Sequence, residues 1–131
     1  MLRILSSVDQ STNVWRIKNG KKSALVNVLF VCSRNQWRSP TAEQVFRRGY
    51  GINTRSAGTA SSAKHVLSAQ DVQWADLICV MEYKHKQRLV AGFGRLLLQQ
   101  RVVVLDIADD YGYMDELLIE LLIQSVSPLL P

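Results

Sequence analysis

Residues 28–46 read VLFVCSRNQWRSPTAEQVF, and the fold can be worked out from this stretch. The apolar, β-branched run over residues 26–31 is typical of a strand that is buried on both faces. The run ends at Cys32, and only five residues separate this cysteine from Arg38. The stretch therefore predicts a strand that leads into a short loop with a thiol at one end and a guanidinium at the other.

A helix is predicted to follow the loop directly. Ser39 suits the N-cap, Pro40 suits the first helical position, and Gly49 suits the end of the helix. The rest of the chain continues to alternate, with strands predicted over residues 52–58, 76–82 and 101–106 and helices over 68–75, 83–93 and 114–126. Such alternation predicts an α/β fold, a small four-stranded parallel sheet flanked by helices.

Length and composition fit one such domain. The chain has 131 residues, of which 47% are hydrophobic. Residues 1–25 hold five basic side chains and one acidic one, so most of the net charge of +5 lies in this segment. We therefore interpret residues 1–25 as a basic N-terminal extension, whose order the sequence leaves open, and residues 26–131 as the domain. Because the domain itself is nearly neutral, a nucleic-acid partner is not expected.

The sequence predicts a protein of the cytoplasm. The longest apolar runs are far shorter than the ~20 residues that span a bilayer, and no secretion signal is expected at the N-terminus. Two cysteines, Cys32 and Cys79, cannot build a disulfide framework, which favours a reducing compartment. Neither a membrane partner nor a disulfide-stabilised fold is predicted.

The cysteine loop suits nucleophilic chemistry on a phosphoryl group. Backbone N–H groups at a helix N-terminus lack helical partners, and the helix dipole is positive there, so the loop can wrap an oxyanion. The same field favours a thiolate at Cys32. Arg38 can hold two phosphoryl oxygens with its planar fork. Ser39 can donate its hydroxyl to the sulfur. Together these groups predict attack by Cys32 on a bound phosphate.

The same stretch resembles the phosphate-binding loop of low-molecular-weight protein tyrosine phosphatases. The segments TRSAGT, WADLICVME and VLDIADDY resemble later parts of that family in the same order, so the resemblance covers about residues 26–126. It is nearest to a compact bacterial branch of predicted protein tyrosine phosphatases. The resemblance implies the low-molecular-weight phosphatase fold and hydrolysis of phosphotyrosine, or another aryl phosphate, through a cysteinyl-phosphate intermediate. It also implies a phosphotyrosine protein or a small aryl phosphate as substrate, and inorganic phosphate as product.

The resemblance also assigns roles to single residues. Cys32 would be the nucleophile and Arg38 the phosphate clamp, and Ser39 would activate the thiolate. Asn35 would hold the loop in its strained shape with Ser56 as its partner. The phosphate would be bound by the loop as a whole, namely by Ser33, Arg34, Asn35, Gln36, Trp37, Arg38 and Ser39.

A general acid is also required, because the leaving oxygen must be protonated. In the family it is an aspartate in the loop after the fourth strand. We expect Asp109 in that role by its register, with Asp110 as the alternative. Tyr111, Tyr113 and Trp37 would line the substrate pocket, where an aromatic wall would favour an aryl phosphate.

Three positions depart from the family's pattern. Trp37 stands where members with two loop cysteines carry the second one, and Arg34 replaces the usual glycine. Asp109-Asp110 replaces the usual Asp-Pro pair. Arg34 therefore either adds a cation at the mouth of the site or projects from the outer face of the loop.

The remaining candidate residues are interpreted as structural. Cys79 lies in the middle of a predicted strand and is expected to be inert. His65 and His85 lack the spacing of metal ligands, so neither a metal nor a cofactor is predicted. His85 is expected on a solvated helix face, where the neighbouring lysines, Lys84 among them, could steer anionic substrates.

Two other functions remain open from the sequence. An arsenate reductase could use the same loop, but it would need a further cysteine as a relay, and only Cys79 is available. A phosphatase that has lost turnover could bind phosphotyrosine or another anion, but the set of Cys32, Arg38, Ser39 and Asp109 argues against that interpretation.

Overall fold

The computed structural model describes residues 25–131. The predicted basic extension, Leu25 excepted, lies outside the described residues. The secondary-structure elements of the described part follow the predicted alternation of strands and helices.

Four strands form one sheet: β1 (Val26–Cys32), β2 (Ile52–Gly58), β3 (Leu77–Val80) and β4 (Arg101–Val104). The order in the sheet is β2-β1-β3-β4, and every neighbouring pair is parallel. The predicted four-stranded parallel sheet is therefore confirmed, with β3 and β4 shorter than expected.

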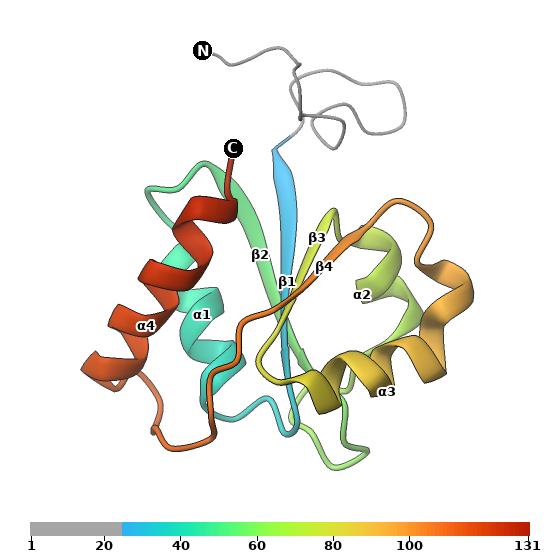
Figure 1. Ribbon diagram of the computed structural model, residues 1–131, viewed down its shortest axis with the longest axis horizontal. Coiled ribbons are helices and arrows are strands. Elements are labelled where there is room, and N and C mark those ends of the chain that lie inside the picture. The colour runs from blue at the N-terminus through green and yellow to red at the C-terminus, as the bar shows by residue number, and fades with distance from the viewer. Residues whose placement is uncertain (1–24) are drawn as a thin grey trace.

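Helices cover both faces of the sheet: α1 (Arg38–Phe46), α2 (Ala69–Trp74), α3 (Tyr83–Phe93) and α4 (Glu116–Val126), with short 3-10 turns η2 (Gly94–Leu96) and η3 (Ser127–Leu129). Figure 1 shows α1 and α4 on one side of the sheet and α2 and α3 on the other. This arrangement explains why β1 is apolar at almost every position, since both of its faces are covered.

The side chains of β1 belong to two separate clusters of core residues, one on each face of the sheet. Successive side chains of a strand point to opposite faces of the sheet. Val28 and Phe30 pack with Phe46 of α1 on one face, where the rings of Phe30 and Phe46 stack with centroids 5.8 Å apart. Leu29 and Val31 pack on the other face against α2 and α3. The central strand is thereby fixed from both sides, and its end at Cys32 is rigidly placed.

One prediction about α1 is wrong. The helix begins at Arg38, Trp37 occupies the N-cap position without a side-chain hydrogen bond, and Ser39 lies inside the first turn. Ser39 is fully buried, and its hydroxyl is engaged with the cysteine loop instead of the helix end. Gly49 lies just beyond the helix with φ of 83°, a conformation that favours glycine.

The carboxyl ends of β1, β3 and β4 meet at one edge of the sheet (Figure 1). Backbone bonds continue the ladder past the strands, with the N–H of Met81 donating to Val31 and that of Ile107 to Met81. The chain segments that follow β1, β3 and β4 are thus held side by side. In parallel α/β sheets this edge is where ligands bind.

Candidate active site

The loop after β1 folds back over its own cysteine. Asn35 adopts a left-handed backbone with φ of 56°, and its N–H lies 3.3 Å from the sulfur of Cys32. The Asn35 side-chain amide donates to the hydroxyls of Ser56 at 2.9 Å and Ser39 at 3.0 Å. A non-glycine residue in this conformation is costly and persists where its surroundings fix it. The hydroxyls of Ser39 and Ser56, both buried, fix the Asn35 side chain and with it this backbone conformation.

The hydroxyl of Ser39 is poised to donate to the sulfur of Cys32. The oxygen and sulfur atoms lie 3.0 Å apart, and both residues are buried. The Ser39 oxygen accepts a hydrogen bond from Asn35, and its own proton has two acceptors within reach, the Ala57 carbonyl oxygen at 3.4 Å and the nearer sulfur of Cys32. A hydrogen bond given to a sulfur stabilises its negative charge. The local geometry therefore suits a thiolate.

The loop also offers unpaired backbone donors. Within residues 25–131, no protein acceptor takes the N–H groups of Ser33, Arg34, Gln36 and Trp37. These donors follow one another along a loop that leads into the N-terminus of α1. Successive free N–H groups in a tight turn before a helix form a concave site for an oxyanion.

The Arg38 side chain is only 2% exposed and is held by the chain segments that follow β3 and β4. Its Nη1 donates to Glu82 Oε2 at 2.7 Å and to the carbonyl of Ile107 at 2.8 Å. Burial alone would raise the pKa of Glu82, but the hydrogen bond and charge of Arg38 hold it below its usual value. Among residues 25–131, Nη2 has no hydrogen-bond partner and Nε has only the 3.6 Å ion pair with Asp109, so these two groups can act as a side-on fork of the kind that grips two oxygens of a phosphate.

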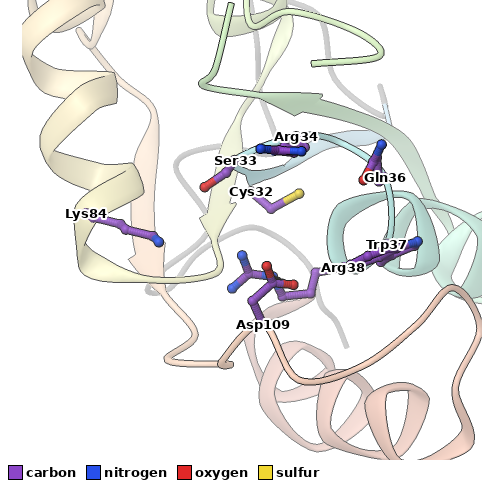
Figure 2. A pocket seen from close by; sticks show the side chains of 8 residues that line it. All are labelled: Cys32, Ser33, Arg34, Gln36, Trp37, Arg38, Lys84 and Asp109. Carbon is purple, nitrogen blue, oxygen red and sulfur yellow. Dashed lines mark ion pairs between the residues drawn. The ribbon is translucent and has the colours of Figure 1, made fainter. Parts of the chain in front are cut away.

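Of the two candidate acids, Asp109 is the one that reaches the pocket. Its Oδ1 lies 3.6 Å from Nε of Arg38, and its side chain is 55% exposed. Asp110 does not line the pocket. Figure 2 shows Asp109 beside the Arg38 guanidinium, on the side of the pocket opposite to Arg34. A carboxylate at this place could exchange a proton with the group that leaves a bound phosphate.

A pocket of about 320 Å³ joins these groups, lined by Cys32, Ser33, Arg34, Gln36, Trp37, Arg38, Lys84 and Asp109 (Figure 2). Trp37 is 47% exposed and supplies the aromatic part of the wall. Tyr111 instead packs against the core, and Tyr113 is 54% exposed outside the lining. A substrate contact by either tyrosine remains a prediction.

The expectation that His85 lies on a solvated helix face is wrong. The residue is fully buried in the first turn of α3. Its Nδ1 accepts the N–H of Glu82 at 3.0 Å, so its Nε2 carries the proton and donates to the Ser33 hydroxyl at 2.9 Å. Burial, helped by the charge of Arg38, lowers the pKa of His85 to about 4. The first turn of α3 thus holds the cysteine loop at Ser33 and at Arg38.

Sequence reasoning missed Glu82, although a signal was present. Glu82 follows a fully apolar strand at the carboxyl edge of a parallel sheet, where polar side chains commonly serve a site. His85 carried no comparable signal, because its partner Ser33 is 52 residues away. Lys84, expected to be solvated, is exposed but also lines the pocket.

Gly58 at the end of β2 was also missed as a support of the loop. A Cβ atom at this position would lie 2.5 Å from the carbonyl oxygen of Ser33 and 2.6 Å from Cβ of Ala63. The segment after Gly58 runs along the loop, where the N–H of Thr59 donates to Cys32 and that of Ala60 to Ser33. Only glycine allows the two backbones to approach this closely.

The second cysteine is remote from this chemistry. Cys79 is fully buried in β3, and burial raises the pKa of its thiol to about 12, against the smaller opposing effect of Arg101. Over residues 25–131, no group of three or more His, Cys, Asp or Glu side chains is placed to hold a metal ion. None of the helices in that range has both the length and the hydrophobicity to cross a bilayer.

Comparison with known proteins agrees with this geometry. Residues 27–66 match the family model described as low molecular weight phosphotyrosine protein phosphatase. A protein-arginine-phosphatase of Bacillus subtilis (strain 168) is 32% identical over 97 aligned positions, which cover 53% of this chain. The alignment spans 65% of that relative's own length.

Solved structures share the fold. A mutant of YwlE from Bacillus subtilis is 26% identical with a TM-score of 0.60, covering 79% of this chain and 97% of that one. The tyrosine phosphatase Wzb from Escherichia coli K30, in complex with phosphate, is 19% identical with a TM-score of 0.64. That match covers 81% of this chain and 96% of the other.

Proposed function

We propose that this chain, which belongs to the low-molecular-weight phosphotyrosine protein phosphatase family, hydrolyses phosphate monoesters through a phosphoryl group carried on Cys32. The observation that carries the proposal is the 3.0 Å contact between Ser39 Oγ and Cys32 Sγ, made inside a loop of free N–H groups. A thiolate that is stabilised beside an anion cradle can attack a bound phosphorus atom. The account implies a reducing compartment such as the cytoplasm, because the thiol must stay free.

The first step transfers the phosphoryl group to the enzyme. The Cys32 thiolate attacks phosphorus, the bond between phosphorus and the ester oxygen breaks, and Asp109 gives its proton to that oxygen. Arg38 and the loop N–H groups hold the three non-bridging oxygens throughout. The leaving group departs as a neutral alcohol or phenol.

The second step frees the enzyme. Asp109, now a carboxylate, takes a proton from water as the water oxygen attacks phosphorus. The S–P bond breaks, inorganic phosphate is released, and the thiolate of Cys32 returns. The exposed position of Asp109 beside Arg38 supports this double role, because water and the leaving group reach the same carboxylate in turn.

The substrate we favour is phosphotyrosine in a protein, or another aryl phosphate. Trp37 lines the pocket and is half-exposed, so a flat aromatic ring can pack against it as the phosphoryl group enters the loop. A phosphoserine would leave this wall uncovered. The exposed Tyr113 could extend the contact along the substrate.

A second candidate substrate is phosphoarginine. It is favoured by one observation, the 32% identity to a relative named as a protein-arginine-phosphatase. The same cysteine, clamp and acid would serve, with the leaving group a guanidine nitrogen in place of a phenolic oxygen. Paired peptides that differ only in carrying phosphotyrosine or phosphoarginine would decide between the two by their kcat/KM values.

Two other functions fit the site less well. A reductase that relays oxidation between cysteines would need Cys79, which is buried in the sheet with its pKa raised to about 12. A binding protein without turnover would not need Asp109 in the pocket beside the nucleophile.

Hydrolysis of p-nitrophenyl phosphate, measured beside a thioredoxin- or glutaredoxin-coupled arsenate assay, separates these functions. We expect phosphate release that depends on Cys32 and no arsenate reduction. Arsenate turnover without ester hydrolysis would overturn the proposal, and binding of phosphate with neither activity would favour a protein without turnover.

A further inference from the structure

Two cations lie in the pocket in addition to the buried Arg38. Arg34 comes from the loop after β1, and Lys84 comes from the first turn of α3 (Figure 2). Arg34 is exposed and the Lys84 side chain is 58% exposed, whereas that of Arg38 is only 2% exposed. The pocket therefore has positive charge at two depths, at the floor beside Cys32 and at the solvent-facing rim.

The charges of the pocket do not balance. Arg34, Arg38 and Lys84 line it together with a single carboxylate, Asp109. Glu82 does not line the pocket, and its carboxylate is shared between Arg38 at 2.7 Å and Lys84 at 3.5 Å. Among residues 25–131, Arg34 has no ion-pair partner. The positive surplus grows when Asp109 carries the proton that the first chemical step requires.

The phosphoryl group itself does not need the two outer cations. The free N–H groups of the loop and the side-on fork of Arg38 supply donors for its oxygens. The backbone of Arg34 is already fixed by the N–H of Lys64, which donates to its carbonyl at 3.0 Å. A charged side chain at this position is thus surplus to the cradle, and a rim cation faces whatever is attached to the phosphate.

We propose that Arg34 and Lys84 form a subsite for a second anionic group, a carboxylate or a phosphate, on the same substrate close to the phosphoryl group. The inference rests on the proposed function and narrows its substrate class. We favour an acidic side chain next to the phosphorylated residue of a protein, because rim cations face the residues that flank the one inserted in the pocket. A small aryl phosphate with a second acid group has the same chemistry.

Matched substrates test the subsite. One pair consists of phosphotyrosine peptides flanked by Glu or by Gln, and the other of meta-carboxyphenyl and meta-carbamoylphenyl phosphate. We expect the carboxylate-bearing member of each pair to have a higher kcat/KM by roughly 2- to 30-fold, the range that two exposed ion pairs supply. The preference should shrink as salt is added, because exposed charges are screened.

Variants show whether Arg34 and Lys84 cause the preference for the carboxylate-bearing substrate. In R34Q/K84Q, the ratio of kcat/KM between the carboxylate-bearing substrate and its amide counterpart should fall to about one. The control R48Q/R88Q removes two exposed cations, one beyond α1 and one on α3, that do not line the pocket, and it should keep the wild-type ratio. If only the peptide pair shows a preference for the carboxylate, the subsite recognises an acidic side chain of a protein substrate. If both pairs show it, the subsite recognises a carboxylate on a protein or on a small aryl phosphate. No preference, or an undiminished one in R34Q/K84Q, overturns the subsite.

Failure of the subsite can be told apart from failure of the proposed function. If meta-carbamoylphenyl phosphate is hydrolysed at a rate that depends on Cys32 but meta-carboxyphenyl phosphate is not preferred over it, only the subsite is wrong. If neither is hydrolysed, calorimetric binding of the same two esters to Cys32→Ser still tests the subsite. Equal affinities would then reject it, and tighter binding of the carboxylated ester, lost in the triple variant C32S/R34Q/K84Q, would support it.

Discussion

The imidazole Nε2 of His85 lies 2.9 Å from the hydroxyl of Ser33, so a buried ring of α3 supports the residue next to the nucleophile. The opposite ring nitrogen accepts the N–H of Glu82, and Glu82 holds Arg38. One helical turn therefore orients both ends of the cysteine loop. This arrangement requires a neutral imidazole, because Nδ1 must accept while Nε2 donates.

The neutral state of His85 predicts a pH dependence of stability. Its pKa is about 4 in the folded protein and 6.5 when the chain is unfolded. Between these values the unfolded chain binds a proton that the folded protein does not, so the free energy of unfolding should fall as pH falls from about 6.5. Urea unfolding across this range should show a shallower pH slope in His85→Gln. Equal slopes in the variant and the wild type would contradict the account.

Local pattern was enough to predict the strand, loop and helix around Cys32. The buried strand, the loop and the helix that follows it are encoded within one contiguous stretch of sequence, although the first residue of the helix was predicted wrongly. The role of His85 could not be predicted that way, because helical spacing alone says only that a polar residue tends to face solvent. The prediction that Ser39 is the N-cap of α1 was wrong for a related reason. Serine before an apolar run is typical of an N-cap, but here a buried sulfur competes for its hydroxyl.

Arg38→Lys should be severely damaging although it keeps the charge. In the wild type, Nη1 is committed to Glu82 and Ile107, which leaves Nε and Nη2 for substrate oxygens. A lysine ammonium is a single point donor and cannot make both sets of contacts. We expect kcat/KM for p-nitrophenyl phosphate to fall by about 10²–10³-fold. Arg88→Lys, on the exposed surface of α3, is the matched control, and equal rates for the two variants would remove Arg38 as the clamp.

Asp109→Asn should slow hydrolysis of phosphotyrosine by about 10²–10⁴-fold, the usual worth of general acid catalysis. The loss should shrink for aryl phosphates whose leaving group departs well without a proton. Asp110→Asn should cost little, since Asp110 lies outside the pocket. Single-turnover rates across a leaving-group series would check this. A strong leaving-group dependence confined to Asp110→Asn would move the acid by one residue.

Gly58→Ala should disturb the loop from behind. The added Cβ would collide with the Ser33 carbonyl and with Ala63, so we expect a loss of about 1–3 kcal/mol in the free energy of unfolding, as for other overpacked sites, together with lower kcat. Gly92→Ala on α3 is the control, because nothing lies within 4 Å of its Cβ position. That change should stabilise the protein by roughly 0.5–1 kcal/mol. An unchanged kcat in Gly58→Ala would show that the loop tolerates the strain.

Trapping of the phosphoryl group on Cys32 tests the central claim most directly. Wild-type protein mixed with p-nitrophenyl phosphate, quenched in acid within one turnover and digested, should yield a Cys32 peptide heavier by one phosphoryl group. Cys32→Ser should release no nitrophenolate, because its hydroxyl stays protonated and attacks poorly. Rapid hydrolysis with no phosphorylated Cys32 peptide, or turnover in Cys32→Ser at about a tenth of the wild-type rate or more, would contradict the account.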